Sequence, residues 1–268
     1  MSEVVAGMIE YQKALITSDW VQAIEELTAQ IADTKTIVLV RGESGTGKEC
    51  MARLIHGASA RSQHAFIKVN AALPGDRLAA ELCGHERGAF AGAFRRKLGR
   101  LEFAHHGTLF LDNIELFPRA LQPALLRVVQ EGQCFRIGGR EVIRVDVQLI
   151  AATTQSLEVT ASRDRFSEDS QGLRVVDLQI PPLRERRDDI PALASFFSSR
   201  FTEQYHRPAE LSPEIFALFS EYSWPRNIRE LEELVRRLVV TGHPRPIQED
   251  IRSHLRLARP DQGTLLSA

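Results

Sequence analysis

A glycine-rich segment that ends in lysine gives the clearest chemical signal in the sequence. Its residues are Gly42, Glu43, Ser44, Gly45, Thr46, Gly47 and Lys48. Glycines let successive backbone N–H groups turn inward around phosphate oxygens, and the lysine ammonium can reach the outer phosphates. An apolar run precedes the segment and apolar residues at helical spacing follow it, so it leads into a helix N-terminus, where anions are stabilised. A glycine-rich turn without a ligand is the alternative, but the length of the match and its flanks favour a nucleotide site.

A second chemical feature is an acid at the end of an apolar run, Leu109-Phe110-Leu111-Asp112. Aspartate is common at strand ends, so Asp112 alone indicates little. Beside a phosphate loop, however, a carboxylate in this position can hold Mg²⁺ through water. The two features together predict ATP and Mg²⁺ as cofactors. Glu49 follows the loop lysine, at a position where a serine or threonine hydroxyl usually contacts the metal.

Five β-branched or apolar runs alternate with helical patterns and form the frame for these residues. The runs are Thr36–Val40, Ala65–Val69, Thr108–Leu111, Val147–Ala151 and Val175–Ile180, and Gln122–Gln130 has helical spacing. This alternation predicts an α/β fold with a parallel five-stranded sheet and helices on both of its faces.

The pattern becomes helical after Pro181-Pro182. The sequence Ser212-Pro213-Glu214 is typical of a helix start, and Gly242 is typical of a helix end. Asn227 and Glu230 have capping-box spacing, which predicts that Asn227 caps the next helix. The charged run 184–189 is interpreted as a solvated hinge face. We predict an α/β nucleotide-binding domain over residues 1–187, a small all-helical lid domain over 188–258 and a flexible tail over 259–268.

The overall composition excludes several classes of protein. Hydrophobic residues make up 43% and charged residues 26% of the 268 residues, as in ordinary soluble domains, and no apolar run is long enough to span a bilayer. The net charge of −1 argues against a free-standing nucleic-acid-binding domain. Cys50, Cys83 and Cys134 are far apart and are interpreted as reduced thiols. Because the N-terminus has no signal-peptide pattern, we expect a cytoplasmic protein.

Several uncommon blocks occur in a fixed order along residues 36–257. They are the loop Gly42–Glu49, the segment 81–93 with Gly88, Ala89, Phe90, Ala91, Gly92 and Ala93 at its end, the segments 125–132 and 181–186, and the segment 224–231. This set resembles the AAA+ central domain of bacterial sigma-54-dependent enhancer-binding proteins, whose signature loop is usually written GAFTGA. The resemblance implies an AAA+ P-loop NTPase that forms a ring, usually a hexamer. In that family the signature loop pushes against the sigma-54 form of RNA polymerase.

The resemblance also implies roles for individual residues. Residues 42–49 bind the nucleotide, Asp112 serves Mg²⁺, Asn70 senses the catalytic carboxylate, and Arg229 contacts the nucleotide from the lid. Plainer interpretations stay open: Asn70 as a turn residue at a strand end, Arg229 as a solvated helix charge, and Phe90 as a locally packed side chain. An exposed phenylalanine between glycine and alanine residues nevertheless suits a flexible tip that touches a partner.

The sequence departs from the family pattern at a residue that serves hydrolysis. Family members usually follow the strand-end Asp with Glu, which polarises the attacking water, and here the residue is Asn113. An amide cannot act as a base and supplies no negative charge. Glu115 could replace the missing acid if the strand continued, since two residues further along a strand the side chain returns to the same face.

The arginine fingers are altered as well. Before the fifth strand the family has a segment with two arginines, whereas this chain is one residue shorter there and has Ser167 at the first arginine position. Arg174 or Arg165 could partly substitute, and loss of such an arginine typically costs about 10³-fold or more in rate. Two further departures are Ala91, where the family has the threonine tied to sigma-54 contact, and Thr154, where it has asparagine.

These departures predict a divergent member that binds ATP and assembles but hydrolyses ATP slowly or not at all, and that acts with another sigma factor. Three other hypotheses stay open: an ordinary ATPase in which Glu115 and Arg174 cover the changes, a regulator that binds a cyclic dinucleotide through Arg95, Arg96 and Lys97, and a chaperone-like unfoldase. The expected partners are further copies of the chain, a sigma factor of RNA polymerase, and DNA through a domain absent from this chain. No membrane is expected.

Overall fold

The computed structural model describes residues 26, 36–154, 174–208 and 211–258. Their contacts form two compact units. Among these residues, the sheet-containing unit holds 26, 36–43, 47–154 and 174–180, and the helical unit holds Ser44–Thr46 together with the described residues from Pro181 onward. The predictions for Arg165, Ser167 and the tail 259–268 lie outside the described residues.

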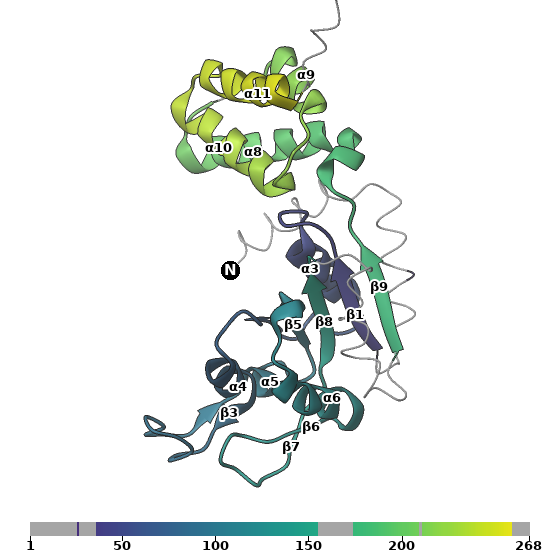
Figure 1. Cartoon of the computed structure of the whole chain (residues 1–268), viewed down its shortest axis with the longest axis vertical. Helices are drawn as coiled ribbons and strands as arrows, with labels where there is room; N and C mark the ends of the chain where they lie inside the picture. Colours follow the sequence, from purple (N-terminus) through teal and green to yellow (C-terminus); the bar gives the residue numbers. More distant parts are fainter. Residues whose placement is uncertain (1–25, 27–35, 155–173, 209–210, 259–268) are drawn as a thin grey trace, which may run out of the picture. The chain divides into compact units, whose positions relative to one another are not determined.

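A parallel five-stranded sheet forms the centre of the first unit, as the sequence predicts (Figure 1). The strands are β1 (Thr36–Arg41), β2 (Phe66–Asn70), β5 (Thr108–Asp112), β8 (Gln148–Thr153) and β9 (Arg174–Gln179), and they lie in the order β2-β5-β8-β1-β9. Every pair of neighbours is parallel. All six residues of β1 are buried, because a parallel sheet is covered on both faces and its strands therefore read as continuous apolar runs.

Two hydrophobic cores cover the two faces of this sheet. Ile37 and Leu39 belong to one core, and Val38 and Val40 belong to the other, because alternate strand residues point to opposite faces. The helices α4 (Gly75–Cys83), α5 (Arg100–Phe103) and α6 (Gln122–Glu131) contribute to the first core, and α3 (Lys48–Ala58) contributes to the second. The start of α3 and the last residues of β2 and β5 therefore lie at the same end of the sheet, where its parallel strands have their carboxyl ends.

Short elements connect these layers. Two antiparallel pairs are β3 (Gly84–His85) with β4 (Lys97–Leu98) and β6 (Gln133–Cys134) with β7 (Ile143–Arg144). The 3₁₀ turns are η1 (Ile114–Leu116), η2 (Arg119–Leu121), η3 (Leu183–Glu185) and η4 (Arg187–Asp189). All three cysteines are free thiols, as predicted, and burial raises the pKa of Cys134 to about 11. A thiol with that pKa stays protonated and unreactive.

In its described residues the second unit has four α-helices. They are α8 (Ile190–Tyr205), α9 (Pro213–Glu221), α10 (Asn227–Thr241) and α11 (Arg245–Ala258), and Figure 1 shows them grouped together. Trp224 is fully buried in this unit and donates from its indole nitrogen to the carbonyl of Phe219 at 2.8 Å. The predicted helix start at Ser212 and the predicted helix end at Gly242 are confirmed. None of the helices in the described part of the chain has both the length and the apolar character that a bilayer span requires.

The capping box predicted for α10 is wrong. Arg226 occupies the N-cap position, and Asn227 is the first helical residue. Glu230 accepts a hydrogen bond from the backbone nitrogen of Arg226 at 3.0 Å. The amide of Asn227 instead accepts from the nitrogen of Leu183 at 2.8 Å and donates to the carbonyl of Ser44 at 3.0 Å. The Asn227 side chain, which the sequence pattern assigns to a helix cap, therefore binds the backbone of two residues that are distant in sequence.

The interpretation of residues 184–189 as a solvated face is also wrong for two of its members. Only 10% of the Arg186 side chain and 7% of the Asp189 side chain are exposed, and their charged atoms lie 3.7 Å apart. Arg186 also donates to the carbonyl of Thr46 at 2.9 Å. Burial raises the pKa of Asp189 in spite of the neighbouring guanidinium. Arg186 and Asp189 are thus buried, and Arg186 is hydrogen-bonded to the glycine-rich loop.

Candidate nucleotide-binding site

At the start of α3, the lysine of the glycine-rich loop is hydrogen-bonded to carbonyl groups of the same loop. Lys48 Nζ donates to the carbonyl of Gly42 at 2.7 Å and to the carbonyl of Glu43 at 2.9 Å. Gly47, with φ of 99°, occupies the N-cap position of α3, a backbone conformation that favours glycine. The first N–H groups of a helix have no partner within it and carry partial positive charge. Lys48 and the first turn of α3 therefore concentrate positive charge at the carboxyl end of β1.

Two of the loop residues that belong to the helical unit, Ser44 and Gly45, contact the start of α10. The backbone nitrogen of Arg229 donates to the carbonyl of Gly45 at 3.4 Å, and its guanidinium lies 3.5 Å from the hydroxyl of Ser44. A Cβ atom on Gly45 would lie 2.2 Å from the carbonyl oxygen of Arg226, and φ of Gly45 is 81°. Glycine is therefore required at position 45. The predicted lid arginine lies beside the middle of the predicted phosphate loop.

Three of the predicted catalytic residues meet where β2 and β5 end. Asn70 and Asp112 are partners in the parallel register of these strands. The side-chain amide of Asn113 donates to Asn70 Oδ1 at 3.0 Å, and the backbone nitrogen of Asn113 donates to Asp112 Oδ1 at 3.1 Å. Two of these three side chains are neutral amides, so Asp112 supplies the one carboxylate among them.

A lysine that the sequence analysis did not weigh lies in the same place. Lys68 Nζ is 2.6 Å from Glu49 Oε2 and 3.4 Å from Asp112 Oδ2. Burial alone would lower the pKa of Lys68, but its hydrogen bond to Glu49 and the charges of both carboxylates raise it. Burial alone would raise the pKa of Glu49, but hydrogen bonds from Lys68 and Arg53 lower it. A sequence signal was present, because Lys68 is two residues before Asn70 and points to the same face of β2.

The residues at this edge fit a magnesium ion that is shared with phosphates. Mg²⁺ is usually held by one or two carboxylates together with substrate phosphates and water. Asp112 supplies such a carboxylate, and its side chain is 25% exposed. Within the described ranges, no three His, Cys, Asp or Glu side chains are placed to hold a metal by themselves. The donor set therefore suits a metal that arrives with a nucleotide.

Glu115 does not replace the missing acid in the way that the sequence analysis considered. The backbone of Asn113 is left-handed, with φ of 57°, and the strand gives way to the turn η1. Glu115 therefore does not lie on a continuation of β5. Its carboxylate accepts a hydrogen bond from the hydroxyl of Thr154 at 3.0 Å. Thr154, at the position where the family resemblance expects asparagine, thus makes a polar contact with Glu115.

Arg174 lies at the other end of the sheet. It is the exposed first residue of β9 and pairs with Thr36, the first residue of β1, whereas the phosphate loop follows the last residue of β1. Five residues of a strand span about 16 Å. The structure therefore does not bring Arg174 to the phosphate loop of its own chain.

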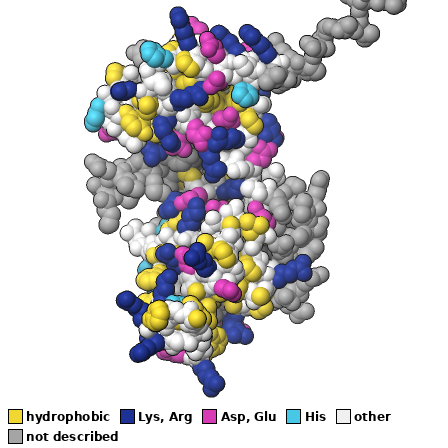
Figure 2. All heavy atoms as spheres, turned by 60° about the vertical axis from the view of Figure 1, so that its left-hand side comes forward, with side chains coloured by type: hydrophobic (Ala, Val, Ile, Leu, Met, Phe, Trp, Pro, Cys, Tyr) yellow, Lys and Arg dark blue, Asp and Glu magenta, His cyan; other side chains and the backbone are white. Residues whose placement is uncertain are grey.

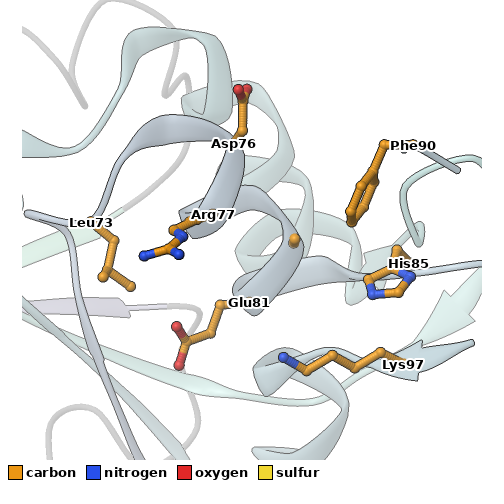
Figure 3. A pocket seen from close by; sticks show the side chains of 8 residues that line it. Leu73, Asp76, Arg77, Glu81, His85, Phe90 and Lys97 are labelled. Atoms are coloured by element: carbon orange, nitrogen blue, oxygen red, sulfur yellow. The ribbon is translucent and has the colours of Figure 1, made fainter. Parts of the chain in front are cut away.

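The predicted partner loop is the tip of the hairpin between β3 and β4. Gly88 and Gly92 have φ of 80° and 100°, and the nitrogen of Gly88 donates to the carbonyl of Ala93 at 2.8 Å. Phe90 is 45% exposed, and its ring centre lies 4.9 Å from that of His85. Phe90 and His85 lie at one end of a cavity of about 470 Å³ that α4 also lines (Figure 3). The loop tip is thus partly folded against its own base.

The surface around this tip is both basic and aromatic. Arg95 and Arg96 are exposed, and Phe94, which the sequence analysis did not single out, is 86% exposed. Figure 2 shows basic side chains protruding beside hydrophobic ones at the end of the sheet-containing unit. Large apolar side chains that stay in water next to charged ones are typical of partner surfaces.

A buried arginine holds the base of the hairpin. Only 4% of the Arg136 side chain is exposed, and it forms a bidentate pair with Glu102 and a hydrogen bond of 2.9 Å with Glu86. These carboxylates raise the pKa of Arg136, so its charge is permanent. Because Glu86 is only two residues before Gly88, this cluster fixes where the loop leaves the domain.

The match to known families settles the classification. Residues 15–179 match the sigma-54 interaction domain, and residues 184–266 match the AAA+ ATPase lid domain. This chain belongs to the sigma-54 interaction domain family. Its α/β sheet and helical lid have the AAA+ fold, which the sequence predicts.

Several known proteins are similar to this chain. The Nif-specific regulatory protein of Klebsiella pneumoniae is 45% identical over 85% of this chain and 44% of its own length, and the regulatory protein AtoC of Escherichia coli is 45% identical over 90% and 53%. NtrX from Brucella abortus, solved in complex with ADP, is 37% identical with a TM-score of 0.73 over 85% of this chain and 51% of that one. A second NtrX structure, in complex with ATP, is 35% identical with a TM-score of 0.72 over 94% and 52%. The chain spans about half the length of the curated relatives it matches.

Proposed function

We propose that this sigma-54 interaction domain binds ATP with Mg²⁺, assembles with further copies of itself around the nucleotide, and hydrolyses ATP slowly. It acts as the ATP-dependent part of a bacterial transcription regulator. The binding of ADP and ATP by the related NtrX supports the choice of ligand. The geometry of the glycine-rich loop supports the mode of binding.

When a nucleotide binds, its phosphate oxygens replace two loop carbonyls as the acceptors of hydrogen bonds from Lys48. Its ammonium donates to two loop carbonyls, Gly42 and Glu43, at 2.7 Å and 2.9 Å. Phosphate oxygens carry formal negative charge and form stronger, charge-assisted hydrogen bonds with an ammonium than neutral carbonyls do. The first N–H groups of α3 complete the cradle. Asp112 would hold the Mg²⁺, which supplies positive charge to the phosphates, and Arg229 adds a second cation from the helical lid.

Slow hydrolysis rests on a single observation, the hydrogen bond from the amide of Asn113 to Asn70. In this arrangement the residue after Asp112 is neutral and cannot take a proton from water. Asn70 accepts from a neighbouring amide and therefore senses no carboxylate there. Phosphoryl transfer depends on positioning and on charge around the phosphate, so the loss of one acid reduces the rate without removing the affinity for ATP.

The partner of the loop Gly88–Ala93 is a sigma factor of RNA polymerase. The family match supports this partner, and the exposed rings of Phe90 and Phe94 provide an apolar contact surface. Contact with DNA belongs to a domain outside this chain. Ala91, which has no hydroxyl to donate, leaves apolar contact as the main source of affinity.

Calorimetric titration with ATP and MgCl₂ tests nucleotide binding. Wild-type protein should bind ATP and ADP, and Lys48→Ala should lose at least about tenfold in affinity, because a charge-assisted contact is worth roughly 1.5–3 kcal/mol. Arg61→Ala is the matched control, since it removes a cation whose partner, Asp146, precedes β8 at the opposite edge of the sheet. Failure of the wild-type protein to bind either nucleotide would show the proposal to be wrong.

A further inference from the structure

Lys68 places a permanent positive charge beside the carboxylate that is expected to hold magnesium. Its Nζ lies 3.4 Å from Asp112 Oδ2 and 2.6 Å from Glu49 Oε2. All three residues belong to the sheet-containing unit. Lysine, unlike a solvent ion, is covalently attached to the strand, so a cation that approaches Asp112 meets its charge.

The fold determines where this ammonium lies. Lys68 and Asn70 point to the same face of β2, in register with Phe110 and Asp112 of β5. Helix α3 covers that face, and its first turn presents Glu49 to Lys68. One turn later Arg53 lies 4.3 Å from the ring centre of Phe66, two residues before Lys68. Two successive contacts between α3 and β2 therefore align the lysine with the end of β5.

We propose that Lys68 competes with Mg²⁺ for Asp112 and thereby makes nucleotide binding by this protein less dependent on the metal. This inference rests on the proposed function. A cation at Asp112 must displace or tolerate an ammonium 3.4 Å away, which weakens metal binding. The same ammonium supplies positive charge to a triphosphate that arrives without metal. Both effects reduce the difference between the affinities for ATP with and without Mg²⁺.

A purely structural role for Lys68 predicts a different result. If the lysine only ties α3 to β2 through Glu49, its removal lowers the stability of the fold and changes ATP affinity equally with and without metal. The ratio of the Kd for ATP without Mg²⁺ to the Kd for ATP with Mg²⁺ distinguishes the two roles. The melting temperature reports any loss of stability independently of that ratio.

The experiment is a calorimetric titration of ATP in 5 mM MgCl₂ and again in excess EDTA. We expect the Kd of the wild-type protein to rise by no more than about threefold when metal is removed, and that of Lys68→Gln to rise by at least about thirtyfold, because the neutral amide frees Asp112 for the metal and no longer attracts free ATP. Lys68→Arg, which keeps the charge, should behave like the wild-type protein. Arg61→Gln is the control for loss of a cation elsewhere in the same unit.

Three outcomes decide the inference. An unchanged ratio in Lys68→Gln overturns it while leaving the proposed nucleotide binding intact. A wild-type Kd that rises by more than about thirtyfold in EDTA also overturns it, and this arm needs no variant to fold. If the wild-type protein binds ATP in neither buffer, the proposed function itself fails and the inference fails with it.

Discussion

Asn113 donates its side-chain amide to Asn70 at 3.0 Å, at the position where the family resemblance expects a catalytic glutamate. Its left-handed backbone, with φ of 57°, turns the chain out of β5, and asparagine tolerates this conformation better than most residues. The same residue thus removes a base from the site and ends the strand. The first effect leaves no general base at position 113, and the second takes the following residues off the line of β5.

Restoring the acid should restore part of the hydrolysis. Asn113→Glu should raise the steady-state rate of ATP hydrolysis by about tenfold or more, because a positioned general base contributes roughly 10²- to 10⁴-fold and the altered arginine segment still limits the rate. The Kd for ATP should change little. Phosphate release at saturating ATP is the measurement.

Asn113→Gln serves as the control for that substitution. Glutamine has the length of glutamate without its charge, and both variants lose about 1 kcal/mol of stability from the left-handed backbone. Equal rates for the two variants would contradict the role that we assign to the missing carboxylate.

Much of the site could be predicted from residue types alone. Gly42–Lys48 and Asp112 lie where the pattern places them, at the carboxyl ends of β1 and β5. The path of the chain after Asp112 could not be predicted, because it depends on the single left-handed residue Asn113, and the strand continuation considered for Glu115 is therefore wrong. The contact of Lys68 with Asp112 depends on how β2 and β5 are registered, which a strand pattern does not specify.

At the scale of elements, Asn227 connects three segments of the helical unit. It is fully buried at the start of α10, accepts from the nitrogen of Leu183 and donates to the carbonyl of Ser44. The spacing to Glu230 predicted a simple helix cap. The prediction failed because the two partners are distant in sequence, 44 and 183 positions away, and a local pattern does not contain them.

Replacing this amide should destabilise the helical unit strongly. Asn227→Ala leaves the buried nitrogen of Leu183 without its partner, which costs roughly 1–3 kcal/mol, and removes the part-buried hydrogen bond to the carbonyl of Ser44. Asn227→Asp keeps the acceptor for Leu183 but cannot donate to Ser44, so its loss of stability should also be large and should include the cost of a buried charge. Urea unfolding at pH 7 measures these differences, and a loss below about 0.5 kcal/mol for Asn227→Ala would contradict the assigned contacts.

A second feature at this scale is the group of Arg136, Glu102 and Glu86 at the base of the hairpin between β3 and β4. Burial alone would raise the pKa of Glu102, but hydrogen bonds from Arg136 and from the nitrogen of Gly99 lower it below its ordinary value of 4.5. The unfolded chain therefore binds this proton more readily than the folded chain. The contribution of Glu102 to stability is complete above its ordinary pKa and is lost as the pH falls through the lowered value.

Glu102→Gln should reveal this contribution as a pH-dependent difference. At pH 7 the variant should be about 3 kcal/mol less stable than the wild-type protein, because a buried guanidinium loses its bidentate partner. The difference should shrink as the pH is lowered from about 5 to about 3. Urea unfolding of both proteins across that range is the measurement, and a difference that stays constant would contradict the pairing.

At the scale of the whole molecule, the α/β class, the five strands and the helical second unit could be predicted from periodicity. The strand order β2-β5-β8-β1-β9 could not, since it depends on which crossovers pack best and not on local pattern. Ring assembly is a property of several chains and is therefore a proposal. Exposed apolar side chains such as Phe103 and Leu116, 54% and 57% exposed, are available for contacts between copies.

Nucleotide should control that assembly. Sedimentation velocity of the wild-type protein should show a shift to higher mass when ATP and MgCl₂ are added, because contacts that form only in the bound state are stabilised by ligand binding. Lys48→Ala at the same ATP concentration should stay at the mass of the free protein. A wild-type mass that does not respond to ATP at concentrations well above its Kd would contradict assembly around the nucleotide.

The most direct test of a domain that binds ATP but hydrolyses it slowly is to measure both properties on one concentrated wild-type sample. Calorimetry supplies the Kd for ATP in MgCl₂, and phosphate release at saturating ATP supplies kcat. We predict measurable affinity together with a kcat below about 0.1 s⁻¹, under the ordinary enzyme range of about 1–10³ s⁻¹. A kcat of about 1 s⁻¹ or more would contradict it and would identify an ordinary family ATPase.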